Sequence, residues 1–299
     1  MVQPLVRPPS RAAQTLSLVS GACSGAASLA TLLSSKTFPP PPGASGFNTA
    51  LAEARGWSSV TLVIGLPLLV ICLLGARTGA SRGAYLGWLG ALTYLVYTYL
   101  ELAVSPPFTA LYLLYVCAFA CAIPALLLGL AAADHAFDAV LVAALPRRTI
   151  ATFALTLAGC LSLAWLKGIA AQTLAGEFGW PSGTDAIGHV VHALDLGLQA
   201  PLAIATAVLL LRQKPGWLVI TAIFLVNSIC MGLALTAMVA FSALAAERSV
   251  FEATPFVLLP IVATALAARF FPRLTAQVAE VQRCSRGIDS GSYASCRHS

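Results

Sequence analysis

Residues 217–241 read WLVITAIFLVNSICMGLALTAMVAF, a run of 25 positions without a charged side chain. About 20 consecutive apolar residues are enough for one helix to cross the hydrocarbon core of a bilayer. This run therefore predicts a transmembrane helix. The number of similar runs along the chain decides the fold class.

Six further runs of comparable length are equally clear, and an eighth is weaker. The six cover residues 58–76, 84–104, 108–132, 149–171, 190–211 and 254–271. The eighth, residues 12–34, is rich in Ala, Ser and Gly, and its Gly21 and Gly25 form a GxxxG step. Small residues let helices approach closely in lipid, so we interpret it as a packed interior helix. We predict an all-α transmembrane bundle of about eight spans over residues 1–272, followed by a disordered basic tail over residues 273–299.

The composition supports this prediction. The chain of 299 residues is 59% hydrophobic and 9% charged, with a mean hydropathy of +0.86. Soluble domains carry about 25% charged residues, so this chain cannot cover a water-facing surface, and the lipid bilayer is its expected surrounding. The net charge of +6 comes without a basic face interleaved with aromatics, which argues against a nucleic-acid partner.

The distribution of Lys and Arg predicts the orientation. With eight spans and a cytoplasmic N-terminus, 13 of the 17 basic residues fall on the cytoplasmic side and four outside; with seven spans the division is 11 against 6. The positive-inside rule favours eight spans and both termini in the cytoplasm. We expect the membrane to be a bacterial-type plasma membrane. The alternative for residues 12–34 is a cleaved signal peptide, because Arg7 and Arg11 precede the apolar run.

Four prolines interrupt the even-numbered spans, and the odd spans contain none. They are Pro67, Pro124, Pro201 and Pro260. An inverted repeat could produce this pattern. Because the prolines lie at different depths, we interpret them as independent kinks.

Ionisable and aromatic residues gather in the outer half of the predicted bundle. The candidate ligand-binding residues are Tyr94, Tyr97, Glu101, Tyr115, Lys167, His189, His192, Asp195 and Gln199. The last four are spaced by three and four residues, which places them along one stripe of a helix. Ionisable groups inside spans are costly, so they usually face protein or water and often mark a functional site.

Three hypotheses account for this cluster. It could be structural, with Asp195 paired to Lys167 or a histidine so that the network locks helices together. It could bind or translocate a small molecule, an ion or a proton, for transport or sensing. In that case Asp195 is the central carboxylate, His192 its proton partner, Glu101 and Lys167 set the local charge, and Tyr94, Tyr97 and Tyr115 line the cavity. It could also be a metal-dependent enzyme site formed by His189, His192, Asp195 and Glu101.

The motif inventory weighs against most enzyme classes. The chain has no P-loop, GxSxG, GxGxxG or CxxCH sequence, and no HExxH helix accompanies the histidines. Most of the five tryptophans lie near predicted span ends, as in an aromatic belt. No cofactor and no oligomeric state follow from these residues, and an enzyme is the less favoured class.

Several segments resemble a family of uncharacterised bacterial integral membrane proteins. The resemblance is carried by VTLVIGLPLL (60–69), LGWLGALTYLVYTYLELAV (86–104), FTALYLLYVCAFA (108–120), HALDLGLQAPL (192–202) and LLLRQKPGWL (209–218). It implies a polytopic bundle, with Tyr94, Tyr97 and Asp195 as landmarks, and brings no known activity. The family often has an acidic residue entering the second span, where this chain has Trp57, Ser58 and Ser59.

Overall fold

The helices begin and end at residues suited to capping. Ser10 and Ser81 accept hydrogen bonds from the backbone N–H groups of Ala13 (3.2 Å) and Ala84 (3.1 Å), so each caps the first turn of a helix. Gly176 ends another helix with a φ of 69°, a left-handed conformation that glycine adopts without steric cost. Local sequence therefore sets these boundaries.

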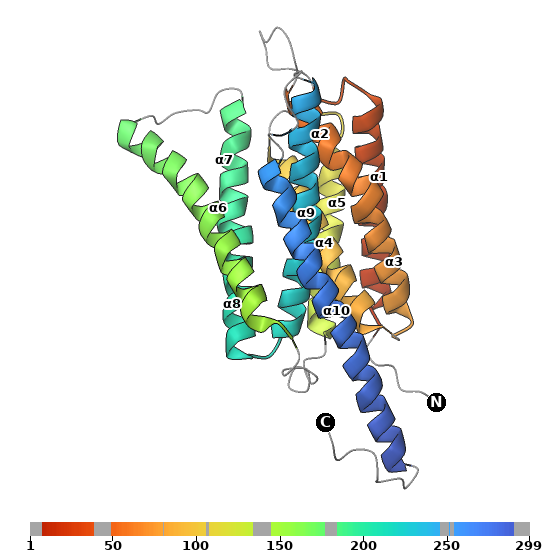
Figure 1. Cartoon of the computed structure of the whole chain (residues 1–299). Coiled ribbons are helices and arrows are strands. Elements are labelled where there is room, and N and C mark those ends of the chain that lie inside the picture. The colour runs from red at the N-terminus through yellow and green to blue at the C-terminus, as the bar shows by residue number, and fades with distance from the viewer. Residues whose placement is uncertain are drawn as a thin grey trace.

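The structure is a computed structural model that describes residues 8–38, 49–79, 81–105, 108–133, 145–176, 184–245, 251 and 254–289 (Figure 1). Over these ranges the secondary structure is helical and contains no strand, as predicted. The elements are α1 (Arg11–Leu33), α2 (Thr49–Val60), η1 (Thr61–Gly65), α3 (Leu66–Arg77), α4 (Arg82–Val104), α5 (Tyr112–Ala132), α6 (Arg147–Ala175), α7 (Thr184–Leu194), η2 (Asp195–Gln199), α8 (Ala200–Arg212), α9 (Trp217–Ala245) and α10 (Thr254–Asp289).

Six helical stretches in the described part are long and apolar enough to cross a membrane. They are Arg11–Leu33, Ala50–Arg77, Tyr112–Ala132, Arg147–Ala175, His189–Arg212 and Trp217–Ala245. The predicted spans 84–104 and 254–271 form helices but do not meet this criterion: tyrosines lower the hydropathy of the first, and the apolar part of the second is the shorter stretch Phe256–Pro272. Six helices of this length and composition fit a multi-pass membrane protein.

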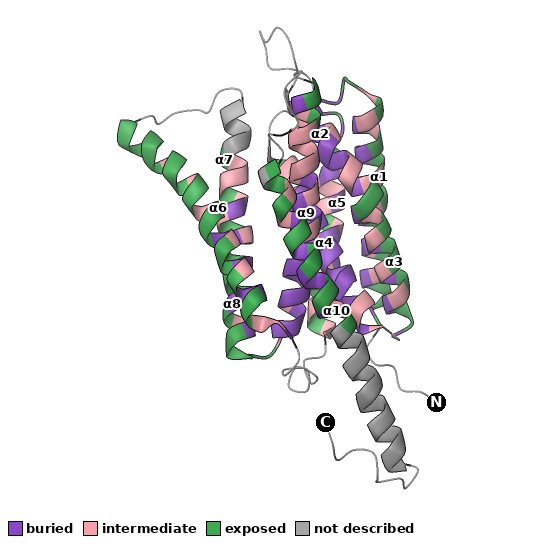
Figure 2. Cartoon of the chain, in the orientation of Figure 1, coloured by how far each residue is buried: buried purple, intermediate pink, exposed green. Residues whose placement is uncertain are grey.

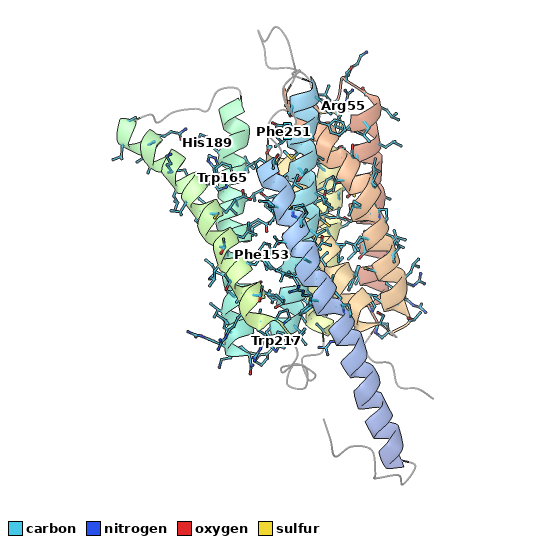
Figure 3. The ribbon with its side chains drawn as sticks, in the orientation of Figure 1. Arg55, Phe153, Trp165, His189, Trp217 and Phe251 are labelled. Atoms are coloured by element: carbon cyan, nitrogen blue, oxygen red, sulfur yellow. The ribbon has the colours of Figure 1, made fainter. Side chains whose placement is uncertain are left out.

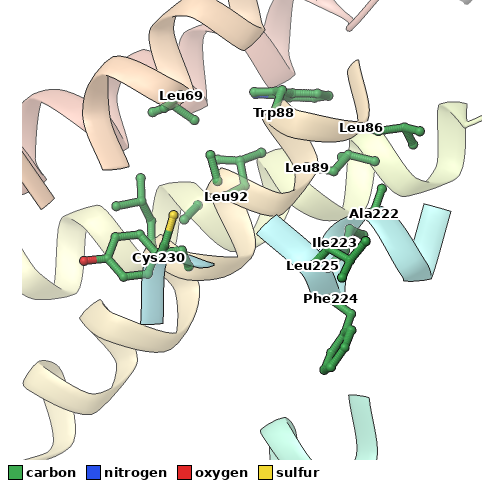
Figure 4. Packing of buried hydrophobic residues seen from close by; sticks show 14 of the residues in the cluster. Leu69, Leu86, Trp88, Leu89, Leu92, Ala222, Ile223, Phe224, Leu225 and Cys230 are labelled. Atoms are coloured by element: carbon green, nitrogen blue, oxygen red, sulfur yellow. The ribbon is translucent and has the colours of Figure 1, made fainter. Parts of the chain in front are cut away.

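Helix α4 lies at the centre of the bundle, which explains its polar aromatic composition. It contacts α3, α5, α9 and α7, and most of its side chains are buried (Figure 2). Its Leu89 packs in one cluster with Leu69 of α3 and Ile223 of α9 (Figure 4). Gly90 lets α9 approach, because a Cβ at Gly90 would lie 2.5 Å from the Cβ of Val226. A helix surrounded by protein can be less hydrophobic than a helix that faces lipid.

Helix α1 packs on the bundle through its small residues, as predicted, but it lies at the edge and not in the interior (Figure 1), with Leu18 and Leu29 each 51% exposed. Ser20 Oγ donates to the carbonyl of Ala118 on α5 (2.8 Å), and the indole N–H of Trp88 donates to Ser17 Oγ (3.0 Å). Gly21 and Gly25 face Leu69 and Leu66, whose methyl groups would lie 3.1–3.2 Å from a Cβ added at either glycine. The GxxxG step therefore serves internal packing.

Two helical rods widen into π-turns immediately before a proline. In η1 the N–H of Leu66 bonds the carbonyl of Thr61, and in η2 the N–H of Ala200 bonds that of Asp195. Pro67 and Pro201 stand six residues after the first residue of each turn. Because proline has no N–H and crowds the preceding turn, a widened turn is a natural accommodation. These two prolines thus share one local geometry, whereas Pro124 and Pro260 lie inside α-helices, and the prediction of independent kinks stays a prediction.

Helices α6 and α7 diverge toward the upper end of the bundle in Figure 1. The lower half of α6 packs on α8 and η2, where Ala151 and Ala154 are buried. Its upper half is largely exposed, including Leu163 (72%) and Leu174 (88%) (Figure 2). The divergence starts close to η2.

Helix α10 continues beyond the predicted end of the bundle at residue 272. It runs to Asp289, so residues 273–289 of the predicted disordered tail are helical, and residues 290–299 lie outside the described part. Ala, Gln, Glu, Leu and Arg together make up nine of the 17 residues 273–289 and have high helix propensity, which accounts for the difference.

Candidate functional site

The carboxylate of Asp195 lies inside the bundle and is held by two aromatic donors. Its side chain is 8% exposed. Oδ1 accepts a hydrogen bond from the hydroxyl of Tyr97 on α4 (2.5 Å), and Oδ2 accepts one from the indole N–H of Trp165 on α6 (2.8 Å). Among the described residues no lysine or arginine completes an ion pair with it. A buried carboxylate with neutral donors alone retains capacity for a positive charge.

The local fold explains why Asp195 reaches these partners. It is the first residue of η2, the widened turn that precedes Pro201. A π-turn rotates the following residues relative to a regular helix and is often found at functional sites. Here α7 above the turn contacts α4, while η2 contacts α6, so Asp195 stands between Tyr97 and Trp165.

The histidines extend this cluster upward along α7. The ring of His192 lies 4.3 Å from that of Trp165, with an interplanar angle of 38°. The ring of His189 follows at 6.1 Å from His192. His192 is half-buried and its Nδ1 has no hydrogen-bond partner, whereas His189 is exposed. Figure 3 shows Trp165 and His189 where α6 and α7 diverge.

Two further acidic residues lie near Asp195. Glu101 follows Tyr97 by four residues and therefore shares its face of α4. It is within electrostatic range of both Asp195 and Glu53, a partly exposed residue on α2. Three acidic side chains thus collect in the upper half of the bundle.

Below Asp195, an amide pair connects η2 to α9. The side-chain N–H of Asn227 donates to Gln199 Oε1 (2.9 Å). Asn227 is 1% exposed, and its own Oδ1 is buried without a partner. An unsatisfied buried acceptor is costly, so this amide has unused capacity to bind a donor.

Other predicted site residues lie elsewhere. Lys167 is exposed and stands about 200° around α6 from Trp165, so its predicted pairing with Asp195 is not formed. Tyr94 bonds the hydroxyl of Thr61 (2.8 Å), and Tyr115 packs against Tyr99 with ring centroids 6.1 Å apart. Tyr115 belongs to α5, which packs on α1 and α4 and not on η2. The structure therefore groups Tyr97, Glu101, His189 and His192 with Asp195.

The geometry does not favour the predicted metal site. In the described residues no group of three or more His, Cys, Asp or Glu side chains is placed to hold a metal ion. The ring of His192 lies against that of Trp165 at a tilt of 38°, and both oxygens of Asp195 already accept hydrogen bonds. A set of ligands converging on one ion would require these contacts to rearrange.

Trp165 is the site residue that sequence reasoning missed. Its place near the end of the predicted span 149–171 is typical of an aromatic belt. In the structure α6 continues to Ala175, so Trp165 lies ten residues before the helix end. That is about 15 Å of helix, so Trp165 does not lie at the end of its helix as the predicted span implied.

The arrangement as a whole gathers acidic side chains, aromatic rings and unpaired acceptors around Asp195. Aromatic faces beside a carboxylate attract cations, including ammonium groups. Comparison with known proteins adds no assignment: no family model, no curated protein and no solved structure matches this chain.

Proposed function

We propose that the protein crosses the membrane eight times, with both termini in the cytoplasm, and that it binds a small cationic molecule or cation at Asp195 for transport or sensing. The six long apolar helices support the membrane location directly. With α4 and α10 counted as two further spans, successive helices cross the membrane in alternating directions. The upper end in Figure 1 is then the outer face.

Charge placement supports this orientation. Of the eleven described Lys and Arg side chains, eight lie in the lower half: Arg11, Arg77, Arg82, Arg147, Arg148, Arg212, Lys214 and Arg269. The described acidic side chains are all in the upper half: Glu53, Glu101 and Asp195. Basic residues collect on the cytoplasmic side of membrane proteins, so the lower end fits the cytoplasm. A bacterial-type plasma membrane and the resemblance to uncharacterised bacterial proteins belong to the same proposal.

The proposal of a binding function depends on the burial and the bonding partners of the Asp195 carboxylate. Its carboxylate is buried, positioned by Tyr97 and Trp165, and without an ion-pair partner in the described part of the chain. A charge in a low-dielectric interior is expensive unless it is paired, so a cation or a proton completes the site. Glu101 and Glu53 place two further acidic side chains within electrostatic range, which disfavours an anionic ligand.

The hinge-like backbone beside the site supports transport or sensing in particular. Asp195 belongs to a π-turn followed by Pro201, a combination at which helices bend. Movement of α7 relative to α8 about this turn would change the contacts of Asp195 with α4 and α6. Many transporters place their binding sites at interrupted helices, and here the interruption is a π-turn within a continuous helix.

Two alternatives remain distinct from this proposal. A structural role would make the cluster a lock between α4, α6 and η2, joined by the two hydrogen bonds of Asp195. A membrane-embedded metal enzyme would need His189, His192 and Asp195 to converge. Only the binding function makes use of the unpaired carboxylate and the spare acceptors.

Native mass spectrometry of the full chain tests the proposal. Wild type is released gently from detergent beside Asp195→Asn, with Lys167→Gln as the matched control, because Lys167 is exposed and outside the cluster. We expect a discrete added mass on wild type and on the control, or a mass shift on adding tetramethylammonium, that Asp195→Asn loses. Equal masses for all three proteins, with and without that cation, would overturn the binding function and leave the structural role.

A further inference from the structure

We propose that the chain consists of two repeats of four spans each, and that α7 is a gate which closes onto α4 on the outer side of Asp195. The template for the closed gate is α2, which already packs on α9 in the corresponding place. The repeat and the gate follow from the fold alone. The coupling of the gate to a ligand rests on the proposed cation binding at Asp195.

The order of the helices occurs twice along the chain. One helix (α1 or α6) precedes a rod that contains a π-turn (α2–η1–α3 or α7–η2–α8), and two further helices follow (α4 and α5, or α9 and α10). Corresponding helices begin at almost constant separations in sequence. Arg11 and Arg147 are 136 positions apart, Thr49 and Thr184 are 135 apart, and the first residues of α4 and α9 are also 135 apart.

The π-turns and the prolines keep this separation. The turns η1 and η2 begin 134 positions apart, and Pro67 and Pro201 behind them are 134 apart as well. Pro124 inside α5 and Pro260 inside α10 are 136 apart. Independent kinks have no reason to keep one separation, so the four prolines favour a repeat.

An approximate two-fold axis relates the packing of the two repeats. Helix α4 packs on α5 as α9 packs on α10, and α4 and α9 pack on each other in the middle of the bundle (Figure 1). Gly90 of α4 faces Val226 of α9, and these two residues are 136 positions apart. Equivalent positions that touch lie on a two-fold axis. Repeats of four spans have the same orientation in the membrane, and such parallel repeats occur in transporters.

The second helices of the two repeats differ in how closely they pack. Helix α2 packs along α9, where a Cβ at Gly56 would lie 2.6 Å from the backbone of Met238. The repeat predicts the same packing of α7 on α4, but α7 contacts α4 over a shorter stretch. Val190 of α7 stands 134 positions after Gly56 and replaces it. Its larger side chain weakens a close contact with α4, as a gate that opens requires.

Burial shows the same difference between α2 and α7. Trp57 and Ser58 of α2 are 8% and 0% exposed. Their counterparts on α7, Val191 and His192, are both half-buried. The part of α7 next to η2 is therefore less covered by its neighbours than the same part of α2 next to η1.

The turn η2 provides the hinge for closure. It is followed by Pro201, and helices bend at π-turns and prolines. Asp195, its first residue, is bonded to Tyr97 of α4 (2.5 Å), which holds the lower end of α7 against α4 while the upper end moves. Since Asp195 lies directly below α7, closure of α7 onto α4 covers the site from the outer side.

Distances between spin labels on the full chain in lipid nanodiscs test the gate by double electron–electron resonance. The labelled pair is Thr184→Cys on α7 with Val104→Cys on α4, in a background without the native cysteines. The reference pair is Ala50→Cys on α2 with Val239→Cys on α9, the equivalent positions of the closed arrangement. We expect one distance for the reference pair and two for the gate pair, the shorter matching the reference. Tetramethylammonium should raise the shorter-distance population about twofold or more.

Three variants test the contact and its coupling to the site. Val190→Gly copies Gly56 and should raise the closed population about threefold, whereas Val190→Trp should remove it. Ala193→Trp, at an exposed position of the same helix, is the matched control and should leave the populations nearly unchanged. Asp195→Asn should remove the response to tetramethylammonium and keep the effect of Val190→Gly.

The contrary results separate the gate from the binding function. One long distance for wild type and for Val190→Gly, with and without tetramethylammonium, would overturn the gate, and the added mass in native mass spectrometry would still support binding. A closed population that ignores tetramethylammonium, although wild type binds it, would overturn the coupling. If wild type gains no mass with tetramethylammonium, the binding function fails, and the two Val190 variants still decide whether the gate exists.

Discussion

Replacing Tyr97 by Phe removes one hydroxyl from the bundle and leaves the ring in place. That hydroxyl donates to Asp195 Oδ1 at 2.5 Å, and Tyr97 is 4% exposed. Hydrogen bonds between neutral groups in membrane proteins contribute about 0.6 kcal/mol on average. Bonds to charged groups contribute about 1.5–3 kcal/mol. We therefore expect Tyr97→Phe to lower the free energy of unfolding by about 1.5–3 kcal/mol.

Tyr85→Phe is the matched control on the same helix. Tyr85 is 2% exposed, and its hydroxyl donates to the neutral carbonyl of Gly129 at 2.6 Å. Its loss should cost only about 0.6 kcal/mol. Reversible unfolding by sodium dodecyl sulfate in mixed micelles, followed by tryptophan fluorescence, measures both values. In an Asp195→Asn background the cost of Tyr97→Phe should fall to that of the control. Equal costs for Tyr97→Phe and Tyr85→Phe in wild type would refute a charge-assisted bond at Asp195.

Three further predictions concern packing, orientation and the amide pair. Gly56→Ala should lower the melting temperature, because the added Cβ would lie 2.6 Å from the backbone of Met238. The control Gly159→Ala, whose Cβ would meet no atom within 4 Å, should leave the melting temperature nearly unchanged. Equal melting temperatures for the two variants would contradict this packing of α2 on α9. In cells, Lys36→Cys should react with a membrane-impermeant thiol reagent and Lys214→Cys should not, in a background without the native cysteines; the reverse pattern would invert the proposed orientation. Asn227→Leu should lower the free energy of unfolding by about 1 kcal/mol because Gln199 loses its donor, and a gain in stability would show that the orphaned Oδ1 outweighs that bond.

The helices were predictable from the sequence because lipid imposes a simple length rule. Runs of about 20 apolar residues, such as 149–171 and 217–241, became α6 and α9. The serines of residues 12–34 lie on the face of α1 that packs on other helices, as predicted. A stripe of small residues in a bundle commonly marks such a helix–helix contact. What sequence could not provide was the position of each helix, because spacing along the chain gives no order around the bundle. The central place of α4 emerged only from its contacts.

The site was predicted in part, and the misses have physical causes. Spacings of three and four place His192, Asp195 and Gln199 on one stripe only if the helix is regular. The π-turn breaks that stripe: Asp195 meets α4 and α6, whereas Gln199 bonds Asn227 on α9. Trp165 escapes sequence reasoning because its partner is distant in sequence and α6 extends past the predicted span. Lys167 attracts attention by its charge, although it faces away from Trp165.

The two π-turns allow a comparison within one chain that separates binding from packing. Thr61 begins η1 and Asp195 begins η2; each precedes a proline by six residues and bonds a tyrosine hydroxyl of α4, at 2.8 Å and 2.5 Å. A neutral threonine is thus sufficient to fix such a turn against α4. Since an unpaired buried charge is costly, a carboxylate at η2 is not required by packing.

That comparison leads to a further prediction, for Asp195→Thr. The substitution should keep the free energy of unfolding within about 1 kcal/mol of wild type, because the hydroxyl replaces one acceptor and removes a buried charge. It should at the same time abolish the added mass that we expect native mass spectrometry to detect on the wild-type protein. A loss of several kcal/mol with an unchanged bound mass would mean that Asp195 serves the fold, and that the two π-turns owe their likeness to packing alone.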